Sequence, residues 1–271
     1  MRALSFSYPS YAHILVPCRL PDNVSFEQAA LAEPLSVLIH ASRRAGLSPS
    51  TPPAQLPQTM VVLGVGAIGL LACAVARSYG VPRVYAIDIN APRLDFARAH
   101  GFADATFCLP PPAGERPRTA DEQLKRAKDA ADAALRHFAL LDEHGDGGAD
   151  VVYECTGAEP CIQQSIFLAG AGAKVLLVGM GTRAAVLPLS AAATREVDVL
   201  GSFRYADTYP AALGMLAQEG SFVRERVGAL VSHRFELGDA RRAFELLAKG
   251  RDEKGGMVLK VVLSPEGQEG Q

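Results

Sequence analysis

The stretch TMVVLGVGAIGLLACAVARSYGVPRVYAID, residues 59–88, decides the fold. Its first residues are rich in β-branched side chains, which predicts a strand. Three glycines in the spacing GxGxxG then predict a tight turn, and the apolar run after them predicts a helix that ends near Gly80. A second strand ends at Asp88, 19 residues after Gly69. These elements in this order are typical of the first half of a dinucleotide-binding sheet.

The three glycines have different roles in such a turn. Gly64 permits the tight turn, Gly66 lets the backbone approach a pyrophosphate, and Gly69 lets the helix pack closely on the strand. The phosphates would lie on the unpaired amides at the positive end of the helix. Asp88 would accept hydrogen bonds from both ribose hydroxyls and repel a 2′-phosphate, which favours NAD over NADP. Methyltransferases that bind S-adenosylmethionine share the turn and the acid, so they are an alternative at this point.

The composition limits the classes of function. The chain has 271 residues, 27 basic and 29 acidic side chains and a net charge of −2, which predicts no bulk attraction to nucleic acid or to an anionic membrane. Its five cysteines are an odd number without a CxxC pair, which predicts a reducing compartment and a cytoplasmic protein. The uncharged run Met60–Ala76 is short for a membrane span, and its glycine spacing favours the sheet. The first residues contain no apolar stretch of signal-peptide type.

Later segments continue the alternation of strands and helices. A strand that runs into a small-residue turn is predicted over ADVVYECTG (149–157), and further strands are predicted over AKVLLVGMG (173–181) and EVDVLGSFRY (196–205). A helix is predicted over CIQQSIFLAGAG (161–172). This alternation predicts an α/β fold with a Rossmann-type, doubly wound parallel sheet covered by helices on both faces. Ligands then gather at the carboxyl ends of the strands, which carry Asp88, Thr156, Gly179 and Arg204.

Residues 109–148 do not follow the plain sheet pattern and are predicted to be an insertion. Within them a charged helix is expected from about Thr119 to Leu141, and Thr119 and Glu122 have the spacing of a capping box. Its apolar stripe predicts packing against the edge of the sheet, and a partner-binding helix is the alternative. The stripe consists of Leu124, Ala127, Ala131, Leu135 and Phe138.

The stretch LAEPLSVLIHASRRAG, residues 31–46, places one carboxylate at the start of an apolar helix. Pro34 occupies a favoured first-turn position, and Gly46 follows the last turn. By itself this pattern predicts that Glu33 is an acidic side chain stabilised by the helix N-terminus. His40 is predicted to lie on a face of the same helix.

Four stretches together carry a family resemblance: FEQAALAEPLSVLIHASRRAG, VVLGVGAIGLLACAVARSYGVPRVYAIDINAPRLDFARAHG, VVYECTGAEPCIQ and REVDVLGSFRYADTYPAALGML. The chain resembles the zinc-dependent polyol dehydrogenases of the medium-chain dehydrogenase family, with the sorbitol, xylitol and L-arabinitol dehydrogenases closest in pattern. The similarity extends from about Tyr11 onward, apart from the proline-rich linker and residues 109–148. It argues against a methyltransferase.

The resemblance implies a role for each matching residue. NAD is the implied cofactor, with its pyrophosphate on Gly64, Gly66 and Gly69 and with Ile68 packed beside it. Asp88 and Arg93 would bracket the adenosine ribose. Catalytic roles are implied for Glu33, Arg204 and Tyr205, of which Arg204 and Tyr205 would face a small-molecule polyol. The cofactor turn and the nicotinamide end would contain Thr156, Val178, Gly179, Met180, Ser202, Phe203 and Arg204.

Zinc is also implied by the resemblance, because the family binds the substrate hydroxyl to a catalytic zinc that lowers its pKa. Glu33 matches the glutamate that reaches this metal. The family's cysteine, histidine and second glutamate ligands lie upstream of the equivalent of Tyr11, so the site is predicted to be incomplete here. His13 and Cys18 are less favoured as replacements. Cys155 and Cys161 are expected to be buried thiols.

The resemblance also implies a domain organisation. Residues 1–45 would be a remnant of a GroES-like catalytic domain with its connecting helix, 46–205 the NAD-binding domain with the insertion at 109–148, and 206–271 a return to the catalytic domain. In the last part a helix with apolar Ala240, Ala243, Phe244 and Leu247 precedes a strand over GGMVLKVVL, and these strands are expected to lack partners. A homo-oligomer, either dimer or tetramer, through an edge of the sheet is implied. A catalytically inactive NAD-binding pseudoenzyme is the alternative function.

Overall fold

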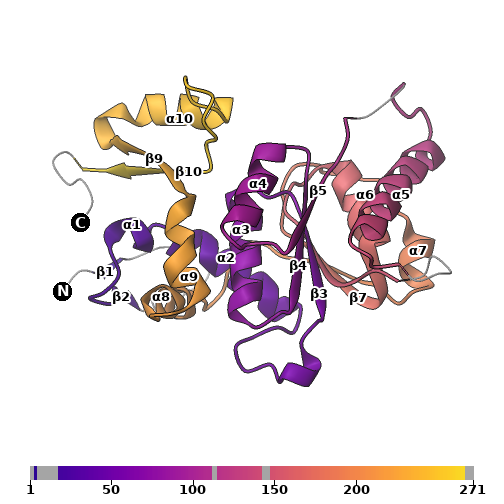
Figure 1. Cartoon of the computed structure of the whole chain (residues 1–271), viewed down its shortest axis with the longest axis horizontal. Helices are drawn as coiled ribbons and strands as arrows, with labels where there is room; N and C mark the ends of the chain where they lie inside the picture. Colours follow the sequence, from indigo (N-terminus) through magenta and orange to yellow (C-terminus); the bar gives the residue numbers. More distant parts are fainter. Residues whose placement is uncertain (1–2, 5–17, 112–114, 142–146, 266–271) are drawn as a thin grey trace. The chain divides into compact units, whose positions relative to one another are not determined.

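The computed structural model describes residues 3–4, 18–111, 115–141 and 147–265 and forms two compact units (Figure 1). The sheet unit comprises residues 40–204, and the terminal unit comprises residues 1–39 together with 205–271. The two ends of the chain therefore contribute to one unit. His13, one of the alternative ligands, lies outside the described residues.

The sheet unit is built on six parallel strands in the order β5-β4-β3-β6-β7-β8. The strand that precedes the glycine turn, β3, lies between β4 and β6. This is the strand order of the doubly wound dinucleotide-binding fold, so the predicted fold class is confirmed. The strands are β3 (Thr59–Leu63), β4 (Arg83–Asp88), β5 (Ala105–Cys108), β6 (Ala149–Glu154), β7 (Ala169–Leu177) and β8 (Asp198–Gly201).

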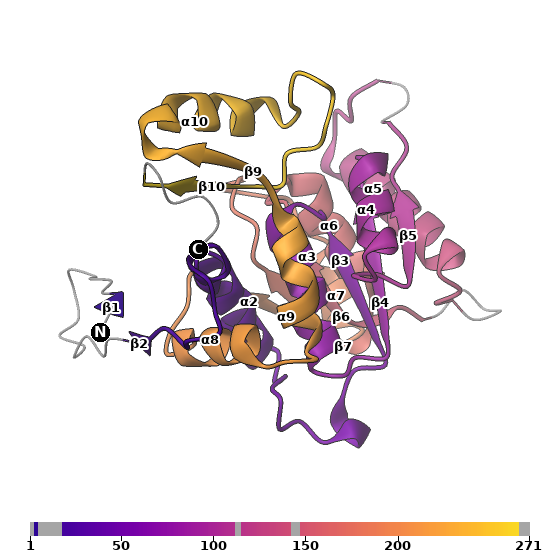
Figure 2. The same ribbon diagram turned by 60° about the vertical axis from the view of Figure 1, so that its left-hand side comes forward.

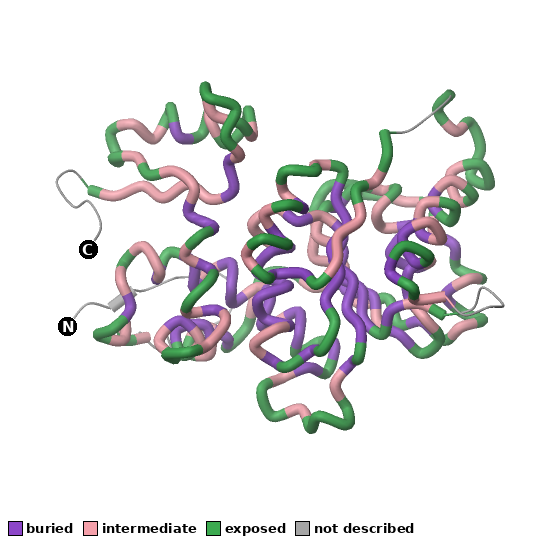
Figure 3. Tube along the Cα trace, in the orientation of Figure 1, coloured by how far each residue is buried: buried purple, intermediate pink, exposed green. Residues whose placement is uncertain are grey.

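Helices cover both faces of this sheet (Figures 1 and 2). Alternate residues of β3 point to opposite faces. Val61 and Leu63 belong to the core shared with α5 and α6, whereas Val62 faces Gly69 in α3. All five residues of β3 are buried, as the tube in Figure 3 shows for the middle of the sheet. One face carries α3 (Ala67–Ser78) and α4 (Ala91–Ala99), and the other carries α5 (Ala120–His137), α6 (Glu159–Leu168) and α7 (Leu189–Ala193).

The helix of the predicted insertion, α5, is part of the core of the sheet unit. Its stripe packs on the face of the sheet and on α6, not on an edge, and Phe138 stacks on Tyr85 of β4 with ring centroids 4.6 Å apart. Thr119 caps the helix by accepting a hydrogen bond from the Glu122 amide at 3.2 Å. The Glu122 carboxylate accepts from the Arg118 amide at 2.7 Å, so the reciprocal bond of a capping box reaches one residue further back.

Several predicted boundaries in the sheet unit are wrong, and the strand predicted over 173–181 is observed over Ala169–Leu177. The predicted helix 161–172 ends at Leu168, and Ala169 already pairs with Ala149 as the first residue of β7. The guanidinium of Arg195 donates to the carbonyl oxygens of Ile166 and Ala169 and so satisfies the end of α6. The predicted strand 196–205 is shortened to Asp198–Gly201, because Glu196 and Arg204 both have a positive φ.

The terminal unit contains two short sheets and several helices. The expectation that the C-terminal strands lack partners is wrong, because β9 (Val231–Glu236) and β10 (Lys260–Ser264) pair in parallel with each other beside α10 (Ala240–Lys249). On α10 only Ala243 of the predicted apolar positions is buried, whereas Phe244 and Leu247 are exposed. The remaining elements are β1 (Ala3–Leu4), β2 (Cys18–Arg19), α1 (Phe26–Ala29), α8 (Tyr209–Ala217), α9 (Phe222–Arg226) and the first part of α2 (Ala32–Arg44). Nowhere in the described ranges is a helix long and apolar enough to cross a membrane.

Candidate dinucleotide site

The glycine turn joins β3 to α3 at the carboxyl edge of the sheet. Gly64 has φ +83°, and a Cβ at this position would lie 2.4 Å from Cγ2 of Thr156. A Cβ on Gly69 would lie 1.9 Å from the carbonyl oxygen of Gly64, so α3 can pack on the turn only with glycine there. At Gly66 the nearest atom to such a Cβ is Nη1 of Arg93 at 3.9 Å. Gly64 and Gly69 are therefore required by the packing of the protein itself, whereas Gly66 leaves room for a ligand to approach the backbone.

The N-terminus of α3 is open to a ligand. Gly66 is its N-cap, and no side chain caps the helix. The helix therefore presents amide hydrogens and the positive end of its dipole at the turn. Arg93, from the first turn of α4, brings a guanidinium near Gly66, and its Nε is buried without a hydrogen-bond partner in the described part of the chain. Ile68 lies in the first turn of α3 and is half-buried.

Asp88 ends β4 and is 7 % exposed. Its Oδ2 accepts a hydrogen bond from the Val65 amide at 2.8 Å, and its Oδ1 accepts from the Asn90 amide at 2.9 Å. A carboxylate has about four acceptor sites, so both oxygens keep capacity for a further donor. The predicted ribose acid thus lies directly beside the glycine turn.

A second pair of loops follows β6 and β7. Glu154, the last residue of β6, is completely buried, and its carboxylate accepts hydrogen bonds from the amides of Thr156 and Gly157 and from the Thr156 hydroxyl. A Cβ on Gly157 would lie 2.5 Å from the carbonyl carbon of Met180, and a Cβ on Gly179 would lie 2.1 Å from the Gly157 amide nitrogen. The two loops are therefore packed backbone against backbone.

The end of β8 extends the same edge. The Ser202 amide donates to the carbonyl oxygen of Leu177 at 3.0 Å, which holds this end beside β7. The Ser202 hydroxyl is buried and has no partner among the described residues. Arg204 has φ +55°, and its guanidinium lies 5.6 Å from the centre of the Phe203 ring. Phe203 is 65 % exposed and Met180 is 72 % exposed, so two apolar side chains face solvent at this edge.

The structure thus groups most of the predicted cofactor residues at one edge of the sheet unit. Winding reverses between β3 and β6, and ligands of doubly wound sheets bind outside the carboxyl ends of the two strands at such a point. The glycine turn and Thr156 meet there. Two of the three predicted catalytic residues, Glu33 and Tyr205, belong to the terminal unit instead.

In the terminal unit Glu33 has a neighbour that the sequence did not single out. Tyr209, the first residue of α8, makes an edge-to-face contact with Tyr205, with ring centroids 5.3 Å apart. Burial raises the pKa of the Tyr209 phenol, and the adjacent Tyr205 and the negative charge of Glu33 raise it further. Tyr209 and Glu154 are the two residues that sequence reasoning missed. The signal for Glu154 was an acid at the end of a predicted strand, two residues before Thr156 and Gly157.

The described residues do not fit a catalytic zinc. No three His, Cys, Asp or Glu side chains among them are grouped so that they hold a metal ion, whereas a catalytic zinc needs three protein ligands. Burial raises the pKa of the thiols of Cys155 and Cys161 and raises that of Cys73 to about 12. These thiols are protonated at neutral pH and are poor ligands and nucleophiles.

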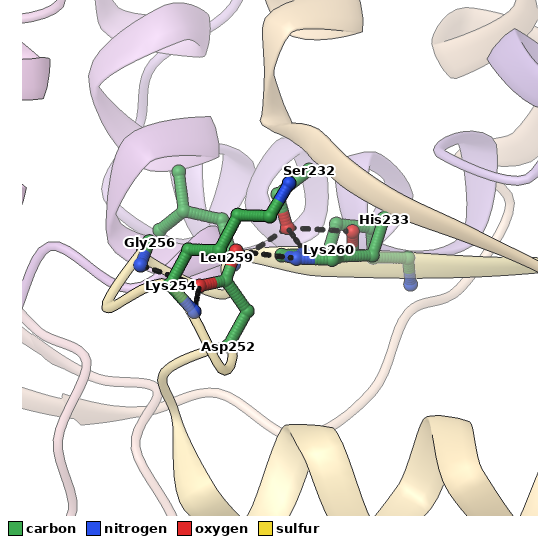
Figure 4. A network of polar contacts seen from close by, with 7 residues as sticks. All are labelled: Ser232, His233, Asp252, Lys254, Gly256, Leu259 and Lys260. Carbon is green, nitrogen blue, oxygen red and sulfur yellow. Dashed lines mark hydrogen bonds and ion pairs between the residues drawn. The ribbon is translucent and has the colours of Figure 1, made fainter.

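A serine, a histidine and an aspartate meet outside this site, in the terminal unit (Figure 4). His233 Nδ1 lies 3.0 Å from Ser232 Oγ, and His233 Nε2 lies 3.4 Å from Asp252 Oδ2. The Ser232 hydroxyl is already used, since it donates to the Lys260 carbonyl oxygen and accepts from the Leu259 amide. The group therefore ties β9 to β10 and to the turn at Asp252, and it does not present a free nucleophile.

Comparisons with known proteins agree on one family. The family model for zinc-binding dehydrogenases matches residues 67–218. The chain is 38 % identical to human sorbitol dehydrogenase over 256 residues, which cover 93 % of this chain and 60 % of that protein. It is 35 % identical to D-xylulose reductase A of Aspergillus niger over 239 residues, covering 87 % of this chain and 58 % of that protein.

The fold is shared with solved structures. One is a Sinorhizobium meliloti protein assigned to the zinc-binding dehydrogenases and bound to NADP, with a TM-score of 0.69 and 25 % identity over 92 % of this chain and 62 % of that chain. The chain thus spans about 60 % of the length of the curated relatives it matches.

Proposed function

Because the chain belongs to the zinc-binding dehydrogenase family, we propose that it is an NAD-dependent oxidoreductase of the polyol dehydrogenase type. The reaction would transfer a hydride from the carbon of a secondary alcohol to NAD and release the hydroxyl proton, so that the alcohol becomes a ketone and NAD becomes NADH. The observation that supports this most is that the glycine turn, the uncapped N-terminus of α3 and Asp88 come together at the carboxyl ends of the strands. Sorbitol and D-xylulose are named for relatives, and they suggest a small polyol as the substrate class here.

The adenosine half of the cofactor would be held by the residues around the glycine turn. The pyrophosphate would lie on the α3 amides over Gly66, where no Cβ blocks its approach. Asp88 would accept from the ribose hydroxyls with the acceptor capacity that Val65 and Asn90 leave. The relative bound to NADP shows that this fold does not by itself fix the cofactor, so the choice of NAD depends on the negative charge of Asp88.

The nicotinamide half would lie along the ends of β6, β7 and β8. When bound, the nicotinamide ring supplies the hydride acceptor, and the protein supplies position and exclusion of water. Met180 and Phe203 are exposed apolar side chains suited to cover a ring. We assign the remaining contacts to Thr156, Val178, Gly179 and Ser202.

We assign contact with the polyol to Glu33, Arg204 and Tyr205. The Glu33 carboxylate would accept a hydrogen bond from a substrate hydroxyl, and the fixed donor fork of Arg204 would orient another. Among the described residues, Glu33 is not grouped with the two further protein ligands that a catalytic zinc needs.

A second candidate function is an NAD-binding protein without turnover. It is supported by the finding that the described residues contain no group of three metal ligands, because Glu33 cannot hold a zinc ion alone. In either case we propose a cytoplasmic protein that forms a dimer or tetramer through an edge of the sheet, where Val199 of β8 is 39 % exposed.

Two measurements separate these candidates. The first is the intact mass of the protein from its native source, compared with 28.6 kDa for this chain. The second is formation of NADH from NAD with sorbitol or xylitol. Polyol-dependent NADH formation supports the dehydrogenase. Binding of NADH without turnover, at a mass that matches this chain, supports the second candidate. Binding of S-adenosylmethionine in place of NADH would contradict both.

A further inference from the structure

Glu154 is a fully buried carboxylate that neither proposed function uses. It is the last residue of β6 and directly precedes the 155–158 loop, which is assigned to the nicotinamide half. Burial of a carboxylate is costly unless donors surround it. Here the Thr156 amide donates to Oε1 at 2.8 Å, and the Gly157 amide donates to Oε1 at 3.1 Å and to Oε2 at 3.0 Å. The Thr156 hydroxyl donates to Oε1 as well.

The same residue also holds the next loop through its backbone. The amides of Val178 and Gly179 both donate to the Glu154 carbonyl oxygen at 2.9 Å. A Cβ on Gly179 would lie 2.7 Å from Oε2 of Glu154, so the carboxylate is in direct contact with that loop. The two loops are joined once more where the Thr182 amide donates to the Gly157 carbonyl oxygen at 2.9 Å.

We infer that Glu154 is a positioning residue that fixes the 155–158 and 178–182 loops in the conformation that binds the nicotinamide half of the cofactor. The inference rests on the proposed function, since it deepens the assignment of these loops to NAD. The adenosine half depends on a different anchor, the bonds from Val65 and Asn90 to Asp88. The two halves of the cofactor should therefore respond differently to changes at Glu154.

The Glu154→Gln variant tests this difference. The glutamine keeps the size of the side chain but removes its charge, and an NH₂ group in place of Oε2 would face the Gly157 amide, which keeps only its bond to Oε1. Affinities are measured by calorimetry for NADH and for ADP-ribose, which lacks the nicotinamide. We expect NADH to bind on the order of tenfold more weakly, since bonds to a charged acceptor are lost, and ADP-ribose to bind within about twofold of the unaltered chain.

The matched control is Glu122→Gln, which makes the same change of charge on α5 of the same unit. It should leave both affinities unchanged. If Glu154→Gln does not fold, Glu154→Asp keeps the charge but withdraws the carboxylate from the Thr156 and Gly157 amides, and it should reduce NADH affinity selectively in the same way.

Each outcome decides between two accounts. Selective loss of NADH affinity supports the positioning role. Equal loss for NADH and ADP-ribose, or no loss for either, would overturn it while leaving the proposed function intact. If the unaltered chain binds neither ligand, the proposed function itself fails, and the role of Glu154 falls with it.

Discussion

The Val65 amide donates a hydrogen bond to Oδ2 of Asp88 at 2.8 Å. This bond joins the middle of the glycine turn to the end of the neighbouring strand. The residue that would choose between NAD and NADP therefore also holds the turn that would bind the pyrophosphate. Asp88 has a structural and a recognition role at once, and substitutions there should affect both.

Asp88→Ala is expected to lower the preference for NADH over NADPH and to reduce stability. The amides of Val65 and Asn90 would lose their acceptor, which costs about 2 kcal/mol for buried groups of this kind. Calorimetric affinities for both cofactors and urea unfolding check the two effects. Asp104→Ala is the matched control, because Asp104 accepts from the Val84 amide at the opposite end of β4. It should lower stability without changing the cofactor ratio, and an unchanged ratio in Asp88→Ala would refute the assignment.

Two glycine substitutions should separate folding from binding. Gly69→Ala places a Cβ 1.9 Å from the Gly64 carbonyl oxygen, so we expect a loss of about 3 kcal/mol or failure to fold. Gly66→Ala places its Cβ in ordinary van der Waals contact with Nη1 of Arg93, at 3.9 Å, and should cost at most about 1 kcal/mol as an N-cap change. It should nevertheless weaken NADH binding at least about tenfold, because it blocks the close approach of the pyrophosphate. Normal NADH affinity in Gly66→Ala would place the cofactor elsewhere.

The helix α5 should contribute to stability and not to cofactor binding. Phe138→Ala removes a buried ring that stacks on Tyr85 and should lower the free energy of unfolding by about 3 kcal/mol. Phe244→Ala removes a ring that is 66 % exposed on α10 and should cost less than about 1 kcal/mol. Similar values for the two variants in urea unfolding would show that α5 is not part of the core.

The turn at Asp252 should make stability depend on pH. The hydrogen bond from the Gly256 amide is the main cause that holds the pKa of Asp252 below its ordinary value of 3.8, and the contact with His233 lowers this pKa further. A depressed pKa in the folded state stabilises the protein above the unfolded pKa, and this stabilisation is lost as the pH falls through the folded pKa.

The corresponding variant is Asp252→Asn. It should unfold at a lower urea concentration than the unaltered chain at neutral pH, and the difference should shrink as the pH is lowered past 3.8. A difference that grows on acidification would show that the carboxylate does not have this role.

The local parts of this structure were predictable from the sequence. Contacts within one strand-turn-helix-strand unit constrain Gly64, Gly69 and Asp88. The spacing of these residues in the sequence was therefore enough to predict the glycine turn and its neighbouring acid. The end of α6 was not predictable, because its carbonyl groups are satisfied by Arg195, which lies 29 positions beyond Ile166. The pairing of β9 with β10 was not predicted for the same reason, because it depends on contacts between residues that are distant in sequence.

The candidate site shows the same division. Glycine and aspartate at the turn carry a recognisable spacing, whereas Glu154 gains its importance from how two loops meet in space. Tyr209 gains its importance from the nearby charge of Glu33, which is distant in sequence.

Calorimetric titration of the purified chain with NADH, NADPH and S-adenosylmethionine tests the central claim most directly. The account predicts that one NADH binds per chain, that NADPH binds at least about tenfold more weakly because of the Asp88 charge, and that S-adenosylmethionine does not bind. Equal affinity for NADH and NADPH would contradict the role of Asp88. Absence of NADH binding would contradict the dinucleotide site as a whole.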